Sequence, residues 1–213
     1  MGSDMALRIV SSLVIGYLLG SVVAAILISR FIFKEDVRTR GSGNSGATNA
    51  ARVYGLPFGL LTFAGDFIKG ILACLAGWFI GGANALADLP LGGCWCMAAA
   101  GAACMIGHCF PVFFRFKGGK GVSVGAALAL MIDWRIFLIG IGIFLLMAIL
   151  TKRVSIGSIL GAASVGVCAC LMKDELPLKL LGVFAAVMVV VRHYSNISRI
   201  INGTEKPFTL GKH

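Results

Sequence analysis

The sequence predicts an all-α membrane protein that crosses the bilayer seven times. Of its 213 residues, 58% are hydrophobic and only 13% are charged, and the mean hydropathy is +0.94. Soluble domains carry about 25% charged and about 45–50% apolar residues. The apolar residues also gather into runs near the length of about 20 that a transmembrane helix needs. We therefore expect one membrane domain over residues 1–213, in which Met1–Asp4 is an added remnant before a natural start at Met5.

The length of each apolar run justifies the predicted spans. The first run is long enough to remain as a span and does not resemble a cleavable signal. The fourth, fifth and seventh runs are short, so we expect them to tilt, to extend into their polar flanks or to be partly re-entrant. The predicted spans are Met5–Ile28, Gly55–Ile80, Leu91–Phe114, Val122–Ile132, Phe137–Leu150, Ile156–Met172 and Leu178–Val191.

The basic residues predict the orientation of the spans. With seven spans, the connections 1–2, 3–4 and 5–6 lie on the same side as the C-terminal tail, and they hold most of the Lys and Arg residues. The opposite side holds only Arg8, Arg135, Lys173 and Lys179. Because basic loops stay in the cytoplasm, we expect the N-terminus outside, the C-terminus in the cytoplasm and every glycine-rich or histidine-bearing segment on the cytoplasmic face.

Charge and cysteine usage argue against two other classes of site. The net charge is +10, but the basic residues lie between apolar runs and form no patch with aromatic residues, so we expect no nucleic-acid binding. The seven cysteines lie almost entirely inside apolar runs and lack the spacing of a zinc site, so we interpret them as small core residues. No carboxylate cluster indicates magnesium. We expect neither a metal nor a cofactor.

A glycine-rich polar segment from Arg40 to Arg52 follows the first span. Its glycines permit positive φ and close backbone approach, and its polar and basic side chains provide donors for an anion. The G-x-G-x-x-G spacing matches the dinucleotide fingerprint, but a membrane span precedes it in place of a strand. We predict a phosphate cradle, with a tight connector between two helices as the alternative. Its candidate residues are Gly41, Ser42, Gly43, Asn44, Gly46, Thr48, Asn49 and Arg52.

A second glycine-rich segment precedes the fourth predicted span, and its residues are Gly118, Gly119, Lys120 and Gly121. It is not an ATPase P-loop, because Phe114 stands where that motif requires a glycine and neither Ser nor Thr follows the lysine. Backbone N–H groups at these glycines and the start of a helix predict a second phosphate site. We expect the nearby His108 to have a structural role near the membrane surface.

Two ionisable residues, Asp66 and Lys69, lie one helical turn apart inside the second span. Such groups cost at least about 2.5–3.5 kcal/mol each within a membrane, so we expect a supporting ion pair, with direct substrate contact as the alternative. Near the C-terminus, His193 and Asn196 are also one turn apart, so both can point at one ligand. Ser155 ends the basic connector between the fifth and sixth spans.

Together these segments resemble the bacterial acyl-phosphate:glycerol-3-phosphate acyltransferases, integral membrane enzymes that begin phosphatidic acid synthesis. The likeness covers essentially the whole chain, through motifs at residues 41–52, 107–121 and 192–205. It implies a seven-span fold in the bacterial inner membrane with the active site at the cytoplasmic face, and it implies that Ser42 and Arg52 are essential. It further implies that the glycines around Lys120 bind the phosphate of glycerol 3-phosphate. The remaining implied residues are Ser155, His193, Asn196 and, as a structural support, Glu205.

The expected reaction moves a fatty acyl group from long-chain acyl phosphate to the 1-hydroxyl of glycerol 3-phosphate, giving 1-acylglycerol 3-phosphate and phosphate. Both substrates carry phosphate, which fits two basic glycine-rich segments; which segment binds which phosphate stays open. No residue is an obvious nucleophile, and the general base is either His193 or a substrate phosphate. A transporter of a phosphorylated metabolite is the alternative, and a structural membrane subunit is a third class. Polar motifs on one face and the lack of an inverted repeat favour the enzyme.

Overall fold

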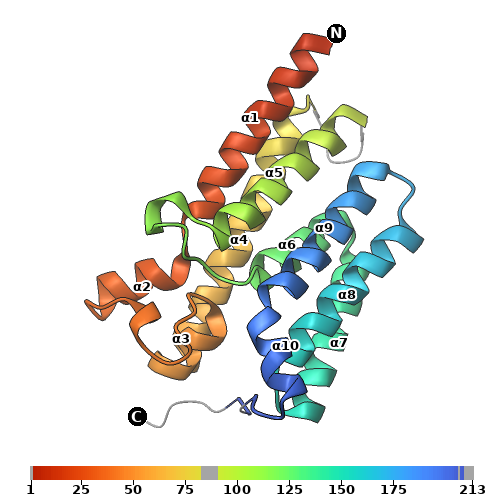
Figure 1. Ribbon diagram of the computed structural model, residues 1–213. Helices are drawn as coiled ribbons and strands as arrows, with labels where there is room; N and C mark the ends of the chain where they lie inside the picture. Colours follow the sequence, from red (N-terminus) through yellow and green to blue (C-terminus); the bar gives the residue numbers. More distant parts are fainter. Residues whose placement is uncertain (1, 83–90, 206, 209–213) are drawn as a thin grey trace.

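The computed structural model describes residues 2–82, 91–205 and 207–208. Met1, the first residue of the predicted remnant Met1–Asp4, therefore lies outside the described residues. The described residues form ten α-helices and two 3₁₀ helices, with no strand among them (Figure 1). The α-helices are α1 (Gly2–Ser21), α2 (Ala24–Ile32), α3 (Ala47–Tyr54), α4 (Leu56–Ile80), α5 (Leu91–Cys109), α6 (Val122–Ile132), α7 (Trp134–Thr151), α8 (Val154–Met172), α9 (Leu176–Arg192) and α10 (Tyr194–Ile201). The 3₁₀ helices are Val37–Thr39 and Val112–Phe114.

Most of the predicted spans appear as helices of sufficient length. Helices α9 and α10 are bent by 57° and form a further span if counted together. Helix α6 has 11 residues, which gives about 16 Å, whereas the hydrocarbon core is about 30 Å thick. The all-helical membrane fold with five or six candidate spans is therefore confirmed, while the count of seven and the orientation stay predictions. Five segments are each long and apolar enough to cross a membrane: Asp4–Ile32, Leu56–Ile80, Cys94–Phe114, Trp134–Thr151 and Val154–Met172.

The first predicted span is interrupted, which the sequence analysis did not predict. Helix α1 ends at Ser21 and α2 begins at Ala24, whereas one continuous run to Ile28 was expected. Helix α1 packs closely on α5, since a Cβ added to Gly16 or Gly20 would come within 2.8 Å of α5 backbone atoms. Such small residues let helices approach each other in a membrane. The chain leaves this contact at the break and continues through α2 to the first glycine-rich segment.

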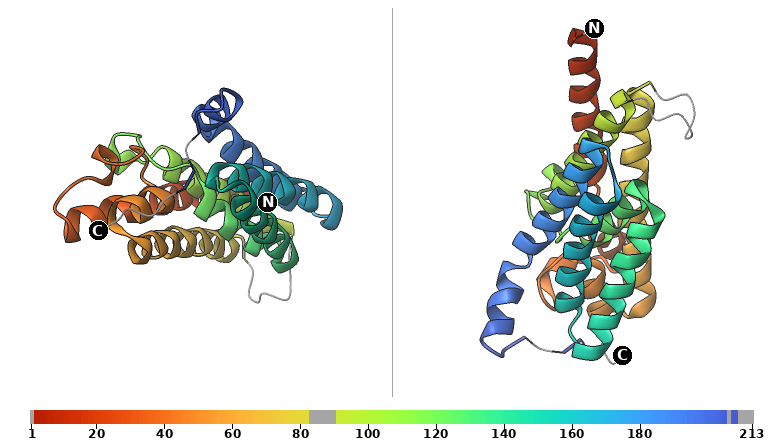
Figure 2. Two further views of the ribbon diagram at one scale, coloured as in Figure 1. Left: turned by 90° about the horizontal axis from the view of Figure 1, so that it is seen from below. Right: turned by 90° about the vertical axis from the view of Figure 1, so that its right-hand side faces the viewer.

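Helix α6 lies between two groups of helices (Figures 1 and 2). On one side α5 packs on α1 and α4, and on the other side α8 packs on α7 and α9. Contacts from α6 to α4, α7 and α9 join the two groups, with Leu128 of α6 fully buried in the main core. Many outer apolar side chains are exposed, such as Ile149 at 72% and Leu171 at 79%. This apolar exterior fits contact with lipid.

The polar segments gather toward one end of the molecule. The start of α1 lies at one end, whereas α3, α10 and the connection between α7 and α8 lie toward the other (Figure 1). These elements carry residues of the first and third sequence motifs. The fold thus brings together segments that are more than a hundred residues apart in the sequence.

Candidate active site

One cavity of about 1030 Å³ lies among α3, α6, α7, α8, α9 and α10. It brings together most of the site residues that the sequence predicts. Of those residues, Gly119, Asp66 and Lys69 are not part of its described lining. The predicted residues that do line it are Gly41, Ser42, Gly43, Asn44, Gly46, Thr48, Asn49, Arg52, Gly118, Lys120, Gly121, Ser155, His193, Asn196 and Glu205.

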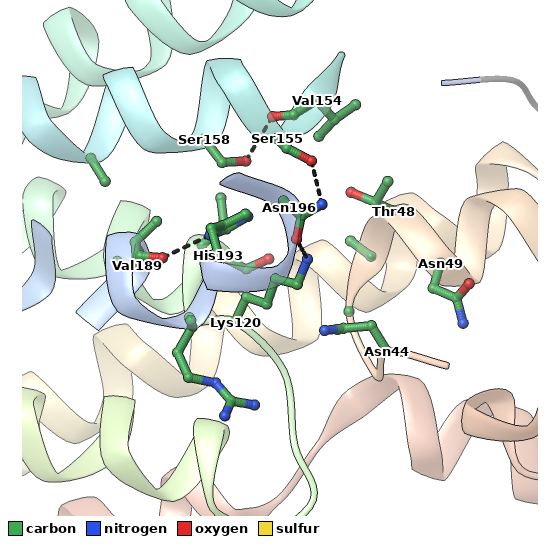
Figure 3. Close-up of a pocket in the computed structure, with 18 of the residues that line it drawn as sticks. Asn44, Thr48, Asn49, Lys120, Val154, Ser155, Ser158, Val189, His193 and Asn196 are labelled. Carbon is green, nitrogen blue, oxygen red and sulfur yellow. Dashed lines mark hydrogen bonds between the residues drawn. The ribbon is translucent and has the colours of Figure 1, made fainter. Parts of the chain in front are cut away.

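The first glycine-rich segment turns through two residues with positive φ. Gly41 has φ +62° and Gly43 has φ +72°, values that favour glycine because it has no Cβ. The turn leads into α3, and Thr48 on that helix lines the cavity. Asn44 and Thr48 face the side chain of Lys120 across the cavity (Figure 3). Their polar atoms are therefore placed to contact a ligand held there.

Asn49 holds this first segment in shape. Its Oδ1 accepts hydrogen bonds from the backbone N–H of Ser42 at 2.8 Å and from the Ser42 hydroxyl at 3.1 Å. Its Nδ2 donates to the carbonyls of Val37 and Arg40, at 3.1 Å each. Asn49 is only 2% exposed, and its amide points away from Lys120 (Figure 3). We predicted a ligand-binding residue here, and this geometry favours a supporting role that fixes Ser42.

Backbone contacts hold the second glycine-rich segment. The N–H groups of Gly118 and Gly119 donate to the carbonyls of Cys109 at 3.2 Å and His108 at 3.0 Å, at the C-terminal end of α5. These two N–H groups are therefore occupied, which differs from the phosphate cradle expected at both glycines. The first N–H groups of α6, from Val122 onward, have no partner within the helix. The start of α6 is thus the part of this segment where backbone donors are available to an anion.

Two arginines fix the carbonyl groups of the same segment. Arg192 donates to the carbonyl of Gly119 from Nε at 3.2 Å and from Nη2 at 3.1 Å. Arg38 donates to the carbonyl of Lys117 at 2.8 Å. The backbone that leads into Lys120 is therefore held before any ligand binds. Sequence analysis did not select either arginine as a site residue, although Arg192 stands within the third motif and lines the cavity.

A hydrogen-bond network crosses the polar end of the cavity (Figure 3). The amine of Lys120 donates to Oδ1 of Asn196, and Nδ2 of Asn196 donates to the Ser155 hydroxyl and to Oε1 of Glu205, at 2.7 Å each. The Ser155 hydroxyl donates to the same Glu205 oxygen at 2.5 Å. Arg199 donates to the other oxygen at 2.6 Å. This geometry fits the supporting role expected for Glu205, because its carboxylate orients Ser155 and Asn196.

The protonation states at this end follow from burial and neighbouring charges. Burial and, after it, the positive charge of Arg199 together lower the pKa of Lys120 to about 8, since both disfavour the ammonium form. Burial alone would raise the pKa of Glu205, but hydrogen bonds from Ser155, Asn196 and Arg199 hold it below its usual value. At neutral pH, Lys120 is therefore mostly protonated and Glu205 is ionised.

The cavity carries an excess of positive charge. Arg52 extends from α3 to within 6.0 Å of the centre of the Phe208 ring, and it lines the same cavity as Lys120, Arg192 and Arg199. Glu205 is the one carboxylate in the described lining. A low-dielectric cleft of one charge sign concentrates ligands of the opposite charge. The polar end therefore fits an anion such as phosphate.

His193 lines the cavity at the bend between α9 and α10. Its Nδ1 lies 2.7 Å from the carbonyl oxygen of Val189, and a carbonyl can only accept a hydrogen bond. In the neutral ring the proton is therefore on Nδ1, which leaves the lone pair on Nε2. Nε2 can accept a hydrogen bond from a ligand hydroxyl.

The inner part of the cavity is apolar, and sequence analysis did not identify its residues. These side chains come from α4 and from α6 to α8. In the sequence they cannot be distinguished from other apolar residues of the spans, because only the packing of the helices brings them around one space. They include Phe63, Ala126, Phe137, Ile141, Phe144 and Val165.

The predicted Asp66–Lys69 ion pair forms inside α4. Lys69 Nζ lies 2.7 Å from Asp66 Oδ1, and their side chains are 8% and 1% exposed. Because neither residue is part of the described cavity lining, the structure favours pairing over direct substrate contact.

Comparison of the sequence with known proteins identifies one family along most of the chain. Residues 10–203 match the family model described as glycerol-3-phosphate acyltransferase. The chain is 38% identical to the glycerol-3-phosphate acyltransferase of Synechococcus elongatus over 201 residues, which cover 94% of this chain and 95% of that protein. It is 36% identical to the enzyme of the same name from Finegoldia magna over 202 residues, which cover 94% of this chain and 95% of that one.

Solved structures agree with these sequence relatives. The crystal structure of PlsY (YgiH), an integral membrane glycerol 3-phosphate acyltransferase, in its glycerol 3-phosphate form has a TM-score of 0.84 at 29% identity, covering 94% of this chain and 96% of that chain. The lysophosphatidic acid form of PlsY has a TM-score of 0.81 at 28% identity, covering 94% and 95%. The chain therefore belongs to the glycerol-3-phosphate acyltransferase family of integral membrane enzymes.

Proposed function

We propose that this protein transfers a fatty acyl group from acyl phosphate to the 1-hydroxyl of glycerol 3-phosphate, giving 1-acylglycerol 3-phosphate and phosphate. The observation that carries the proposal is one cavity with a basic polar end and an apolar inner end. Phosphate groups fit the first end, and a fatty acyl chain fits the second. The PlsY structures named for glycerol 3-phosphate and lysophosphatidic acid support the same acceptor and product.

The polar residues divide between binding phosphate and stabilising charge in the transition state. Arg52 and Lys120 bind the phosphates by charge-assisted hydrogen bonds. Ser42 and the free N–H groups at the start of α6 donate to the remaining oxygens or to the oxyanion that forms on the acyl carbon. Asn196, whose two amide hydrogens already bond Ser155 and Glu205, orients the Lys120 amine through its Oδ1. An acyl phosphate is already activated, so holding it against the acceptor supplies much of the acceleration.

In the proposed reaction, the 1-hydroxyl oxygen attacks the acyl carbon and forms the new ester bond. The bond between that carbon and the phosphate oxygen breaks, and phosphate leaves with the electron pair. The hydroxyl proton passes either to Nε2 of His193 or to a phosphate oxygen. The Nδ1 hydrogen bond to Val189 supports His193, because it directs the free lone pair of the ring to Nε2.

We infer that the site faces the cytoplasm from the bacterial inner membrane, with the N-terminus outside. The support is that the basic segments lie together with the polar end of the cavity, as cytoplasmic loops do. In this arrangement the short helix α6 is counted with the six longer candidate spans, which gives seven. Its start lies at the phosphate site.

Product formation by the purified protein tests the proposal. With glycerol 3-phosphate, we expect palmitoyl phosphate to give equal amounts of phosphate and lysophosphatidic acid, and palmitoyl-CoA to give none. Arg52→Ala should lower kcat/KM by about 100-fold or more, whereas Arg135→Ala, whose partner Asp133 lies outside the cavity lining, should stay near the wild-type value. Turnover of palmitoyl-CoA alone would refute the donor, and turnover of neither donor by folded protein would refute the reaction.

His193→Ala distinguishes the two general bases. If His193 takes the proton, the variant should lose about 100-fold or more in kcat. Full turnover with an unchanged pH profile would exclude an essential histidine base and leave the substrate phosphate.

A further inference from the structure

A buried polar cluster lies between α4 and α5, outside the residues assigned to phosphate binding. It consists of Asp66, Lys69 and His108, whose side chains are 1%, 8% and 3% exposed. Nδ1 of His108 lies 3.1 Å from Lys69 Nζ and 3.4 Å from Asp66 Oδ1. Ionisable groups are costly inside a membrane protein, so three of them in contact call for a role that an apolar core would not fill.

The cluster satisfies the backbone groups that the break between α1 and α2 leaves without helical partners. Lys69 Nζ donates to the carbonyls of Gly20 at 3.0 Å and Val22 at 2.6 Å. Asp66 Oδ1 accepts from the N–H of Ala24, the first residue of α2, at 3.4 Å. A carbonyl or N–H without a partner is especially unfavourable where water is absent. The ion pair therefore stabilises the break from which α2 leads to the first glycine-rich segment.

The other edge of the His108 ring supports the second glycine-rich segment. A Cβ added to Gly119 would overlap Nε2 and would lie 2.8 Å from Cε1 of the ring. The Gly119 N–H also donates to the His108 carbonyl at 3.0 Å, and the Gly119 carbonyl accepts from Arg192 Nη2 at 3.1 Å. Gly119 therefore rests on the imidazole, and the next residue along the chain is Lys120.

The contact with the ion pair also fixes the orientation of the imidazole. Its Nδ1 edge faces both Lys69 Nζ at 3.1 Å and Asp66 Oδ1 at 3.4 Å, so its Nε2 edge is turned toward Gly119. The ring is then held on one side by the ion pair and borders Gly119 on the other. His108 also belongs to the cavity lining.

We propose that His108 is a positioning residue for acyl transfer: held by Lys69 and Asp66, its ring sets the place of Gly119 and thereby of the Lys120 amine. The inference rests on the proposed function, because its readout is acyl transfer. It links the two glycine-rich segments, since one cluster stabilises the helix break that leads to the first and supports the second. Loss of the ring moves Lys120 relative to the phosphate, so it weakens binding of glycerol 3-phosphate more than it slows the chemical step.

Two substitutions separate the two edges of the ring. The Oδ1 of His108→Asn lies close to the position of Nδ1, so this variant keeps the Lys69 contact and loses the Gly119 contact. The amide of His108→Gln reaches toward the position of Nε2, so this variant has the opposite pattern. We expect the KM for glycerol 3-phosphate to rise about tenfold in His108→Asn, with kcat within about twofold of wild type, and to rise less than about threefold in His108→Gln.

A double substitution tests whether the ring acts through Gly119. Gly119→Ala alone should lower kcat/KM by about 100-fold, because its Cβ has no room. In Gly119→Ala/His108→Asn the smaller side chain makes room, and kcat/KM should recover at least about tenfold over Gly119→Ala. Thr62→Val is the control in the same buried region, since Thr62 is buried on α4 and its hydroxyl has no partner among the described residues; its kinetics should match wild type.

Wild-type turnover of palmitoyl phosphate establishes the proposed function independently of these variants. Given that turnover, an unchanged KM in His108→Asn, a fall in kcat alone, or a double variant no better than Gly119→Ala would each overturn the positioning role. If His108→Asn does not fold, a His108→Gln protein that folds and shows a tenfold higher KM would overturn it equally, because this variant keeps the Gly119 edge.

Discussion

The two glycine-rich segments have similar compositions but are held in different ways. The first depends on one side chain, Asn49, which makes three hydrogen bonds within the segment and a fourth to the carbonyl of Val37 just before it. The second depends on main-chain contacts with the end of α5 and on the missing side chains of Gly118 and Gly119. Glycine therefore has two uses here: it permits a turn in the first segment and a close approach of two backbones in the second.

Adding a methyl group to the second segment should reduce activity more than any other change predicted below. In Gly118→Ala, the Cβ would overlap the His108 carbonyl and lie 2.6 Å from Cδ of Pro111, so kcat/KM should fall about 100-fold. In Gly46→Ala of the first segment, φ is −113° and the nearest atom is the Asn44 side chain at 3.1 Å, so the fall should be within about threefold. Steady-state kinetics with both substrates measure this contrast, and equal losses would contradict it.

Removal of the Asn49 side chain should have the next largest effect. Asn49→Ala leaves the Ser42 N–H without its partner, and such a group costs about 1–3 kcal/mol. It also removes one of the two hydrogen bonds of the Val37 and Arg40 carbonyls, which still accept from the N–H groups of Arg40 and Gly43. We expect kcat/KM to fall about tenfold or more and the melting temperature to fall with it. Asn202→Ala, at an exposed position after α10, is the matched control. If the Asn49→Ala enzyme has wild-type kinetics, the first segment is held by other contacts and this prediction is wrong.

The dependence of the KM for glycerol 3-phosphate on pH should be a smaller effect than the loss in Asn49→Ala. It should come from the second segment alone. With a pKa of about 8, the protonated fraction of Lys120 falls about tenfold between pH 7 and pH 9. Because the ammonium form binds phosphate, the KM for glycerol 3-phosphate should rise by about the same factor over this range. Lys120→Arg stays charged and should remove the rise. The same rise in Lys120→Arg would assign it to another group.

The smallest effect is expected at Ser45, in the first segment. Its side chain is buried, and its hydroxyl has no hydrogen-bond partner among the described residues. Ser45→Ala should raise the free energy of unfolding by up to about 1 kcal/mol, because an unsatisfied buried hydroxyl is removed. Thermal unfolding measures this change, and kcat/KM should stay at the wild-type value. A loss of activity would indicate that this hydroxyl contacts substrate.

Much of the helical pattern follows from hydropathy, and its exceptions have physical causes. The predicted Val122–Ile132 run matches α6 at both ends, because a glycine and an aspartate bound it. Helix α7, the fifth predicted span, starts at Trp134 and thus earlier than the predicted Phe137. The reason is that the Asp133 carboxylate caps the helix by accepting from the Arg135 N–H at 2.9 Å. The break after Ser21 was not predictable from hydropathy, because the partner of its backbone groups, Lys69, is far away in the sequence.

The chemical character of the site was predictable from local sequence, whereas the task of each residue was not. Lys120 and Asn196 were both selected from their motifs, and the structure places them in contact. The supporting tasks of Asn49 and Gly118 depend on which carbonyls lie within reach, and that is decided by tertiary packing. The apolar lining around Phe137 is likewise set by how the helices meet.

The cavity joins two environments in which concentration means different things. Glycerol 3-phosphate is counted in moles per litre of water, whereas a fatty acyl donor is counted as its fraction of the membrane lipid. Adding inert lipid at a constant total amount of donor therefore slows acyl transfer by diluting the donor within its own phase. In the proposed reaction the acyl donor is thus supplied per unit of membrane area, whereas glycerol 3-phosphate is supplied per unit of volume.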